Sequence, residues 1–191
     1  MLSTGSDPSA STAPLIVIRD TGLPPPKAEL DPLLAVHAAA FPTDAEAQLV
    51  RRLFAGHDVL FSVAADRDDQ LVGHVLVSAM THEHGGSVRG LAALAPLAVH
   101  PDHQRRGVGT ALAREAVRQA REHRLAALFV LGDPDFYRPL GFRPAADHGY
   151  TPPESVPPEH HHAFQVLPFP HRRPVPPGRV RFAGPFDDLD N

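Results

Sequence analysis

The stretch from residue 91 to residue 131 constrains the fold more than any other part of the chain. Leu91 to Val99 is a nearly continuous apolar run, which is typical of a strand buried on both faces of a sheet. Apolar residues recur at helical spacing from about Gly107 to His123, and Ala126 to Leu131 is a second apolar run. Because this strand–helix–strand connection is long enough for a right-handed crossover, we expect the two strands to be parallel.

The segments on either side predict the rest of a layered domain. Before the crossover we expect a strand, two helices and a hairpin of two strands, at about 15–18, 27–40, from residue 43 or 44 onward, 59–65 and 71–79. After it we expect a helical turn at 134–140, a strand beginning at Phe142 and another at 163–167. This order predicts a mixed sheet with helices on its faces, which is an α/β or α+β fold.

The two ends of the chain are less regular. Residues 1–14 are small and polar, and we expect a disordered tail there. Residues 15–191 then form a single domain, in which the segment from about 168 is proline-rich and irregular apart from a strand near Val180–Phe182. Phe182 and Phe186 in this segment either cover the sheet or line a binding site.

Composition excludes several classes of function. The chain has no cysteine, which rules out disulfides, thiolate zinc sites and cysteine nucleophiles. A net charge of -4 argues against a protein that binds nucleic acid through bulk electrostatics. Apolar runs are far shorter than the ~20 residues that span a bilayer, and no targeting segment is recognised, so we expect a cytoplasmic protein without membrane contact. His160, His161 and His162 are adjacent in sequence, a spacing that rarely ligates one metal ion.

The loop that opens the long helix is typical of an anion-binding site. It comprises Gln104, Arg105, Arg106, Gly107, Val108, Gly109 and Thr110. The first N–H groups of a helix have no internal partner and carry partial positive charge, and glycines let a bulky anion approach them. The spacing matches neither the Walker loop nor the Rossmann fingerprint. We therefore expect a phosphate or pyrophosphate ligand; the alternative is a glycine-containing turn that only starts the helix.

At these residues the chain resembles the GNAT superfamily of N-acetyltransferases. The loop motif occupies Gln104–Gly109 and follows a strand end at Val99–Pro101. A second family element, a tyrosine followed four residues later by Gly-Phe, occupies Tyr137–Phe142. The preceding Leu131–Pro134 looks like the YhbS-like bacterial branch. The chain departs from many members at Gly132-Asp133, where those members have asparagine.

This resemblance implies a fold and a cosubstrate. It implies a mostly antiparallel central sheet with helices on both faces and a splayed pair of parallel strands that binds acyl-CoA. The amides of residues 104–110 would bind the CoA pyrophosphate. The strand end at Leu97, Ala98 and Val99 would bind the pantetheine arm, with Leu97 and Val99 pairing through their backbone. The cosubstrate implied is acetyl-CoA, and no metal is implied.

The family position of Tyr137 implies a general acid. A phenol with a pKa of about 10 is protonated at neutral pH and can donate to a departing thiolate. The alternative is a packed tyrosine whose hydroxyl bonds to backbone. An attacking amine must also lose a proton, and the candidate bases are Glu46, His82, Glu83, His84 or a water relay. Glu46 is equally consistent with a surface acid at a helix start, so the sequence leaves the base open.

The sequence therefore predicts an N-acetyltransferase that moves an acetyl group from acetyl-CoA to a primary amine by direct attack. The acceptor is expected to be a small-molecule or peptide amine, and the protein a monomer or homodimer. The alternative from another class is a non-catalytic CoA-binding or interaction module that keeps the loop without the base. A third interpretation, a nucleic-acid surface on the helix face with Arg114, Arg118, Arg121 and Arg124, competes with an ordinary solvated face.

Overall fold

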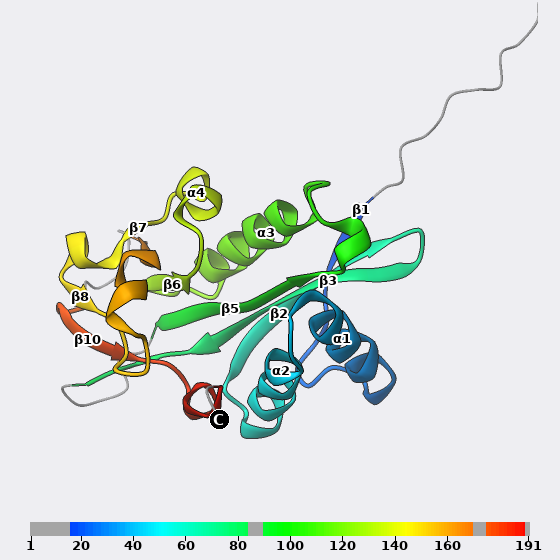
Figure 1. Ribbon diagram of the computed structural model, residues 1–191, viewed down its shortest axis with the longest axis horizontal. Coiled ribbons are helices and arrows are strands. Elements are labelled where there is room, and N and C mark those ends of the chain that lie inside the picture. The colour runs from blue at the N-terminus through cyan, green and yellow to red at the C-terminus, as the bar shows by residue number, and fades with distance from the viewer. Residues whose placement is uncertain (1–15, 84–89, 170–174, 190–191) are drawn as a thin grey trace, which may run out of the picture.

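A computed structural model describes residues 16–83, 90–169 and 175–189 (Figure 1). The tail expected at 1–14 and the candidate base His84 lie outside these residues. Within them, no helix is long and apolar enough to cross a lipid bilayer.

A seven-stranded mixed sheet forms the centre of the molecule (Figure 1). Its strands follow the order β1 (Ile16–Asp20), β2 (Val59–Arg67), β3 (Gln70–Ala79), β5 (Leu91–Val99), β6 (Ala127–Leu131), β9 (Phe164–Pro168) and β7 (Arg143–Pro144). Every neighbouring pair is antiparallel except β5 and β6, which are parallel as the crossover predicts. The predicted fold class is confirmed.

Helices cover both faces of this sheet (Figure 1). Helices α1 (Lys27–Ala40) and α2 (Ala45–Gly56) lie on one face, and α3 (Val108–Glu122) and the short α4 (Pro134–Tyr137) lie on the other. Short 3-10 helices occur at Pro101–His103, Arg138–Leu140, Ala145–His148, Pro158–Ala163 and Gly184–Asp188.

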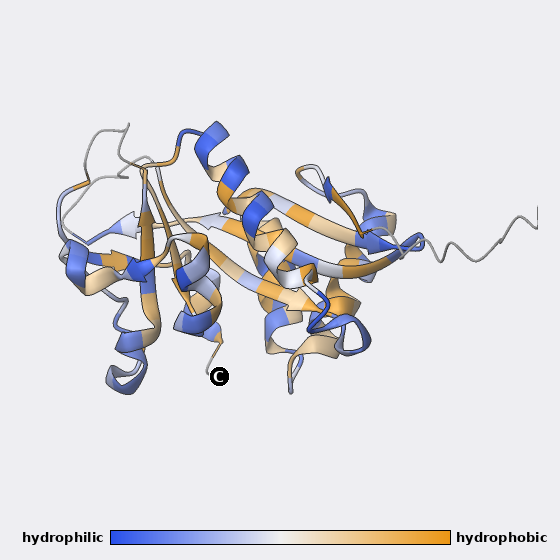
Figure 2. Cartoon of the chain, turned by 90° about the horizontal axis from the view of Figure 1, so that it is seen from above, coloured by the Kyte–Doolittle hydropathy of each residue, from blue (hydrophilic) through white to orange (hydrophobic). Residues whose placement is uncertain are grey.

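The long helix α3 shows why the sequence pattern is informative. Leu112, Ala116 and Ala120 are fully buried against the sheet. Arg118 lies on the outer face and pairs with Glu115 and Glu122. Figure 2 shows the same division across the molecule, with hydrophobic residues on the strands and hydrophilic ones on the outer sides of the helices. Of the four arginines on this basic face, Arg118 thus has two acidic partners on its own helix.

A second, three-stranded sheet lies at one end of the molecule. It contains β4 (Thr81–His82), β10 (Gly178–Arg181) and β8 (Tyr150–Thr151). The strand β10 pairs antiparallel with β4 and parallel with β8, and its Val180 is fully buried. The strand expected near Val180–Phe182 is thus observed as β10, where the buried Val180 lies between two arginines and the partner strands come from distant parts of the sequence.

The parallel pair β5 and β6 separates after a short contact. Pairing runs only from Leu91–Ala93 to Ala127–Phe129. On its other edge, β5 stays paired with β3 as far as Val99, apart from an irregularity in register at Ala95 and Pro96. Among the described residues no strand pairs with the β6-facing edge of β5 beyond Ala93, and this opening is where the candidate site lies.

Candidate active site

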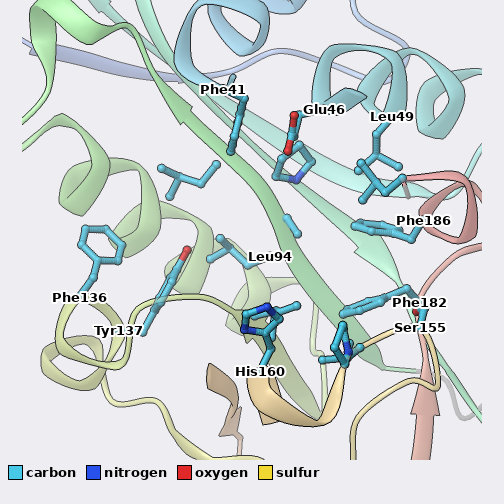
Figure 3. Close-up of a pocket in the computed structure, with 17 residues that line it drawn as sticks. Phe41, Glu46, Leu49, Leu94, Phe136, Tyr137, Ser155, His160, Phe182 and Phe186 are labelled. Atoms are coloured by element: carbon cyan, nitrogen blue, oxygen red, sulfur yellow. The ribbon is translucent and has the colours of Figure 1, made fainter. Parts of the chain in front are cut away.

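Two adjacent cavities flank the splayed part of β5. The first, which we call the loop cleft, has a volume of about 590 Å³ and lies beside the N-terminus of α3. The second, which we call the apolar cavity, has a volume of about 630 Å³ and lies further along β5 toward the C-terminal segment (Figure 3). Phe41, Leu97 and Phe136 line both, so the cavities share a boundary.

The backbone of the loop is shaped to present amides to the loop cleft. Gly107 precedes α3 in a left-handed conformation with φ of 84°, and Arg105 is also left-handed with φ of 57°. The first amide of this helix that bonds back into it belongs to Ala111, which donates to the Gly107 carbonyl over 3.0 Å. The amides of the three preceding residues therefore have no acceptor within the helix. The Gln104 side-chain amide donates to the Val99 carbonyl over 3.0 Å, which ties the loop to the strand end.

Glycine at position 109 keeps the loop cleft open. A Cβ atom built on Gly109 would lie 3.6–3.7 Å from Phe136, Val99 and Leu97, all of which line the cleft. Methyl contact is tolerated at that distance, but a larger side chain would fill the space between helix and strand. A Cβ atom on Gly107 would meet nothing within 4 Å, so space does not require glycine here. The positive φ of this position favours glycine instead.

The structure brings most of the predicted cosubstrate-binding residues to one place. The loop cleft is lined by Leu97, Val99, Gln104, Arg105, Gly107, Gly109 and Thr110, together with Ala40, Phe41 and Phe136. The side chains of Ala98 and Val108 are each 1% exposed and belong to the core, which leaves only their backbone for a ligand. Arg106 is exposed and does not line the cleft.

Tyr137 enters the apolar cavity from α4. Asp133 caps this helix, because its carboxylate accepts from the Asp135 amide over 2.9 Å. The ring packs edge-on against Phe136 and Phe142, with centroids 4.8 Å and 5.4 Å away. Its hydroxyl is directed toward β5 and has no hydrogen-bond partner among the described residues (Figure 3). Burial raises the pKa of this phenol to about 12, so it stays protonated.

Gly132 makes room for that ring. A Cβ atom at Gly132 would lie 2.8 Å from Cε2 of Tyr137, closer than side chains approach each other. The glycine is held from both sides, because its amide donates to the Ala163 carbonyl and its carbonyl accepts from the Gln165 side chain, both over 3.1 Å. The departure from the asparagine of many family members thus has a structural consequence, which is space for the tyrosine.

Glu46 faces the apolar cavity from the first turn of α2. The helix begins after Asp44, and the Thr43 hydroxyl accepts a hydrogen bond from the Ala45 amide over 3.3 Å. Glu46 begins the face of α2 that also carries the buried Leu49, Val50 and Leu53, and with Leu49 it lines the cavity. One oxygen of its carboxylate is buried without a hydrogen-bond partner in the described structure. Figure 3 shows Glu46 and Tyr137 on opposite sides of β5, around the same space.

The other candidate bases lie elsewhere. Glu83 forms ion pairs with Arg179 and Arg181 in the second sheet, and His82 lies near Pro177 there. Neither lines the loop cleft or the apolar cavity. Of the described candidates, only Glu46 faces Tyr137 across a cavity.

Comparison with known proteins identifies the family. The sequence profile described as the acetyltransferase (GNAT) family matches residues 30–142, more than half of the chain. The chain belongs to the GNAT acetyltransferase family. It is similar to the N-acetyltransferase YjhQ of Escherichia coli K12, with 31% identity over 83% of this chain and 90% of YjhQ. It is also similar to YhbS of the same strain, with 36% identity over 57% of this chain and 65% of YhbS.

Solved structures of GNAT proteins share the fold closely. The crystal structure of YhbS from Escherichia coli in complex with CoA superimposes with a TM-score of 0.81 at 27% identity, over 96% of each chain. A GNAT acetyltransferase from Brucella melitensis, in complex with acetyl-CoA, gives a TM-score of 0.71 at 26% identity over 90% of this chain and 98% of its own. Family membership makes this GNAT protein an acyltransferase.

Several walls of the GNAT site have no signature in the sequence. Besides Glu46 and Tyr137, the apolar cavity is lined by Phe41, Leu49, Leu94, Ala95, Pro96, Leu97, Leu131, Phe136, Ser155, Val156, Pro157, His160, Phe182, Phe186 and Leu189. They come from segments far apart in the chain. Of them, the sequence predicts only Leu97 as a cosubstrate-binding residue, and only Phe182 and Phe186 as residues that cover the sheet or line a binding site. His161 and His162 instead bond to the backbone carbonyls of Val156 and Glu159, so the three histidines do not converge.

Proposed function

We propose that the protein transfers an acetyl group from acetyl-CoA to a primary amine that enters the apolar cavity. The observation that carries this proposal is the placement of Glu46 and Tyr137 around one cavity, next to the unpaired edge of β5. The two GNAT structures described above were solved with CoA or acetyl-CoA, which supports the same cosubstrate for this chain.

Acetyl-CoA fits the loop cleft by its chemistry. The pyrophosphate would accept from the amides at the N-terminus of α3, where the helix dipole and Arg105 supply positive charge. The pantetheine arm is an extended amide chain, and the free edge of β5 beyond Ala93 offers it backbone groups in the manner of an added strand. With the cosubstrate bound in this way, the thioester would lie at the boundary between the two cavities.

The two polar side chains then divide the proton transfers. The amine nitrogen attacks the thioester carbonyl carbon, the carbon–sulfur bond breaks, and the electron pair leaves on sulfur. Glu46 takes the first proton, which frees the amine from its ammonium form before it attacks. The Tyr137 hydroxyl donates its proton to the departing thiolate, and the second proton that the nitrogen loses restores the Tyr137 hydroxyl. The burial that raises the pKa of Tyr137 also disfavours a bare thiolate there, so a donor in contact with sulfur lowers the barrier.

The test measures both products of one reaction. Purified protein is incubated with acetyl-CoA and a panel of primary amines, while free CoA thiol and acetylated amine are quantified together. The proposal predicts equal amounts of the two. A non-catalytic CoA-binding module would bind acetyl-CoA with neither product formed, and thiol release without acetylated amine would show hydrolysis instead.

A further inference from the structure

The walls of the apolar cavity select among amines. We propose that the acceptor carries a single positive charge at its amine and a hydrophobic, ring-containing body. This inference rests on the proposed function, since it names the substrate class of the same site. All lining residues except Glu46, Ser155 and His160 are apolar or aromatic.

The charge of the cavity matches one ammonium group. Glu46 is the only carboxylate among the lining residues, and one of its oxygens is buried with no hydrogen-bond partner in the described parts of the chain. An ammonium group entering the cavity can pair with the Glu46 carboxylate. A second ammonium on the same acceptor would lose its water against rings and aliphatic side chains, and burying an unpaired charge is strongly unfavourable. Polyamines and aminoglycosides therefore fit this cavity poorly.

The shape of the cavity favours a ring over a thin alkyl chain. Phe182 and Phe186 stack with centroids 4.9 Å apart and form one broad wall (Figure 3). The cavity volume of about 630 Å³ is in the range that holds small organic ligands. A lysine side chain would fill only a thin part of it and leave these rings in contact with water.

Leu131 gives independent evidence that the wall serves a ligand. Its side chain is 41% exposed, although it lines the cavity at the end of β6. Val17 and Leu23, each 47% exposed, are the other large hydrophobic residues with this exposure in the described chain, and neither lines the apolar cavity. An acceptor with an apolar body would cover Leu131.

The first experiment compares amines that differ only in their body. CoA release is measured with 3-phenylpropylamine, n-propylamine, α-blocked lysinamide and spermidine. Burying one phenyl ring predicts a kcat/KM for 3-phenylpropylamine that is roughly 30–100-fold above that of n-propylamine. The two amines with a polar or charged body should lie near or below n-propylamine. Spermidine or blocked lysinamide matching the phenyl compound would overturn the inference.

The second experiment uses a matched pair of variants. Leu131→Thr removes apolar wall but keeps a residue suited to a strand, and Leu23→Thr makes the same change at a similarly exposed position outside the apolar cavity. We expect Leu131→Thr to lower kcat/KM for 3-phenylpropylamine several-fold while that for n-propylamine changes little. Leu23→Thr should leave both unchanged. Equal effects of Leu131→Thr on both amines would contradict the inference.

A binding measurement separates this inference from the proposed function. Calorimetry with CoA-loaded protein measures the affinity for 3-phenylpropylamine and n-propylamine without any chemistry. If no amine is acetylated but the phenyl compound still binds at least tenfold more tightly, the proposed transfer falls and the ligand class stands. If amines are acetylated and no preference for the ring appears in either assay, the transfer stands and the inference falls. Absence of both turnover and preference overturns both.

Discussion

Removing the hydroxyl of Tyr137 should damage catalysis and leave stability intact. The hydroxyl has no hydrogen-bond partner among the described residues, so Tyr137→Phe breaks no internal hydrogen bond. The ring is 9% exposed and keeps its contacts with Phe136 and Phe142. Loss of general acid catalysis predicts a kcat lower by about 10²–10⁴, which raises the activation free energy by about 3–5 kcal/mol. The free energy of unfolding should stay within about 1 kcal/mol of wild type, because only a desolvated polar atom is lost.

The assay is a single-turnover rate of CoA release together with urea unfolding of the same preparation. A single-turnover rate is insensitive to slow product release, so it reports the chemical step. A matched variant, Gly132→Ala, keeps the hydroxyl but places a methyl 2.8 Å from the ring, which must retreat by about half an ångström or more. That displacement should also slow the chemical step, since catalytic groups depend on their placement. A Phe variant within threefold of wild type would remove Tyr137 from the mechanism.

Three further predictions address binding, the base and pH. Gly109→Val should abolish the increase in melting temperature that acetyl-CoA causes, while the unliganded protein stays folded. The reason is that a Cβ atom fits at this position but a larger side chain fills the loop cleft. An unchanged thermal shift would contradict this prediction. Glu46→Gln should lower kcat by about 10²-fold or more at nearly constant acetyl-CoA affinity. A normal kcat would show that Glu46 is not the base and would favour a water relay. His37 and His74 share a buried hydrogen bond of 2.8 Å. Burial lowers the pKa of His37 from 6.5 to about 4. As the pH falls below 6.5, this histidine therefore binds a proton in the unfolded chain before it does so in the folded protein. The free energy of unfolding should thus drop by about 3 kcal/mol between pH 6.5 and pH 4. Urea titrations that give a flat free energy of unfolding across this range would refute it.

Local sequence patterns predict the elements of the fold because each pattern depends on neighbours in the chain. The helix expected at about 27–40 is observed as α1 at Lys27–Ala40. The hairpin turn also follows from local chemistry, since Asp68 and Asp69 both adopt positive φ between β2 and β3. The parallel pairing of β5 and β6 follows from the handedness of crossovers.

The separation of β5 from β6 has no such local cause. Both strands are apolar throughout, and their composition predicts pairing along their full length. The resemblance to the GNAT superfamily supplies the splay that the structure shows beyond Ala93. The position of β10 also has no local cause, because its partner strands β4 and β8 are far away in the sequence and become its neighbours only in the folded protein.

The choice of base shows where sequence reasoning stops. Glu46 and Glu83 are both acids next to the ends of predicted elements, and nothing in their neighbours distinguishes them. The fold places Glu46 at the cavity that Tyr137 also lines, and Glu83 against Arg179 and Arg181. The catalytic roles of Glu46 and Tyr137 are predictions that the variants Glu46→Gln and Tyr137→Phe test.

Direct transfer between two bound substrates is the central claim, and intact-protein mass spectrometry during one turnover tests it. Protein in excess is mixed with acetyl-CoA, first without amine and then with 3-phenylpropylamine, while the protein mass and free CoA are followed. Direct attack predicts an unmodified protein and no CoA release until amine is added, and then formation of acetylated amine and CoA at the same rate. An acetylated protein that forms before the amine is added, and disappears as product appears, would contradict direct attack within the cavity between Glu46 and Tyr137.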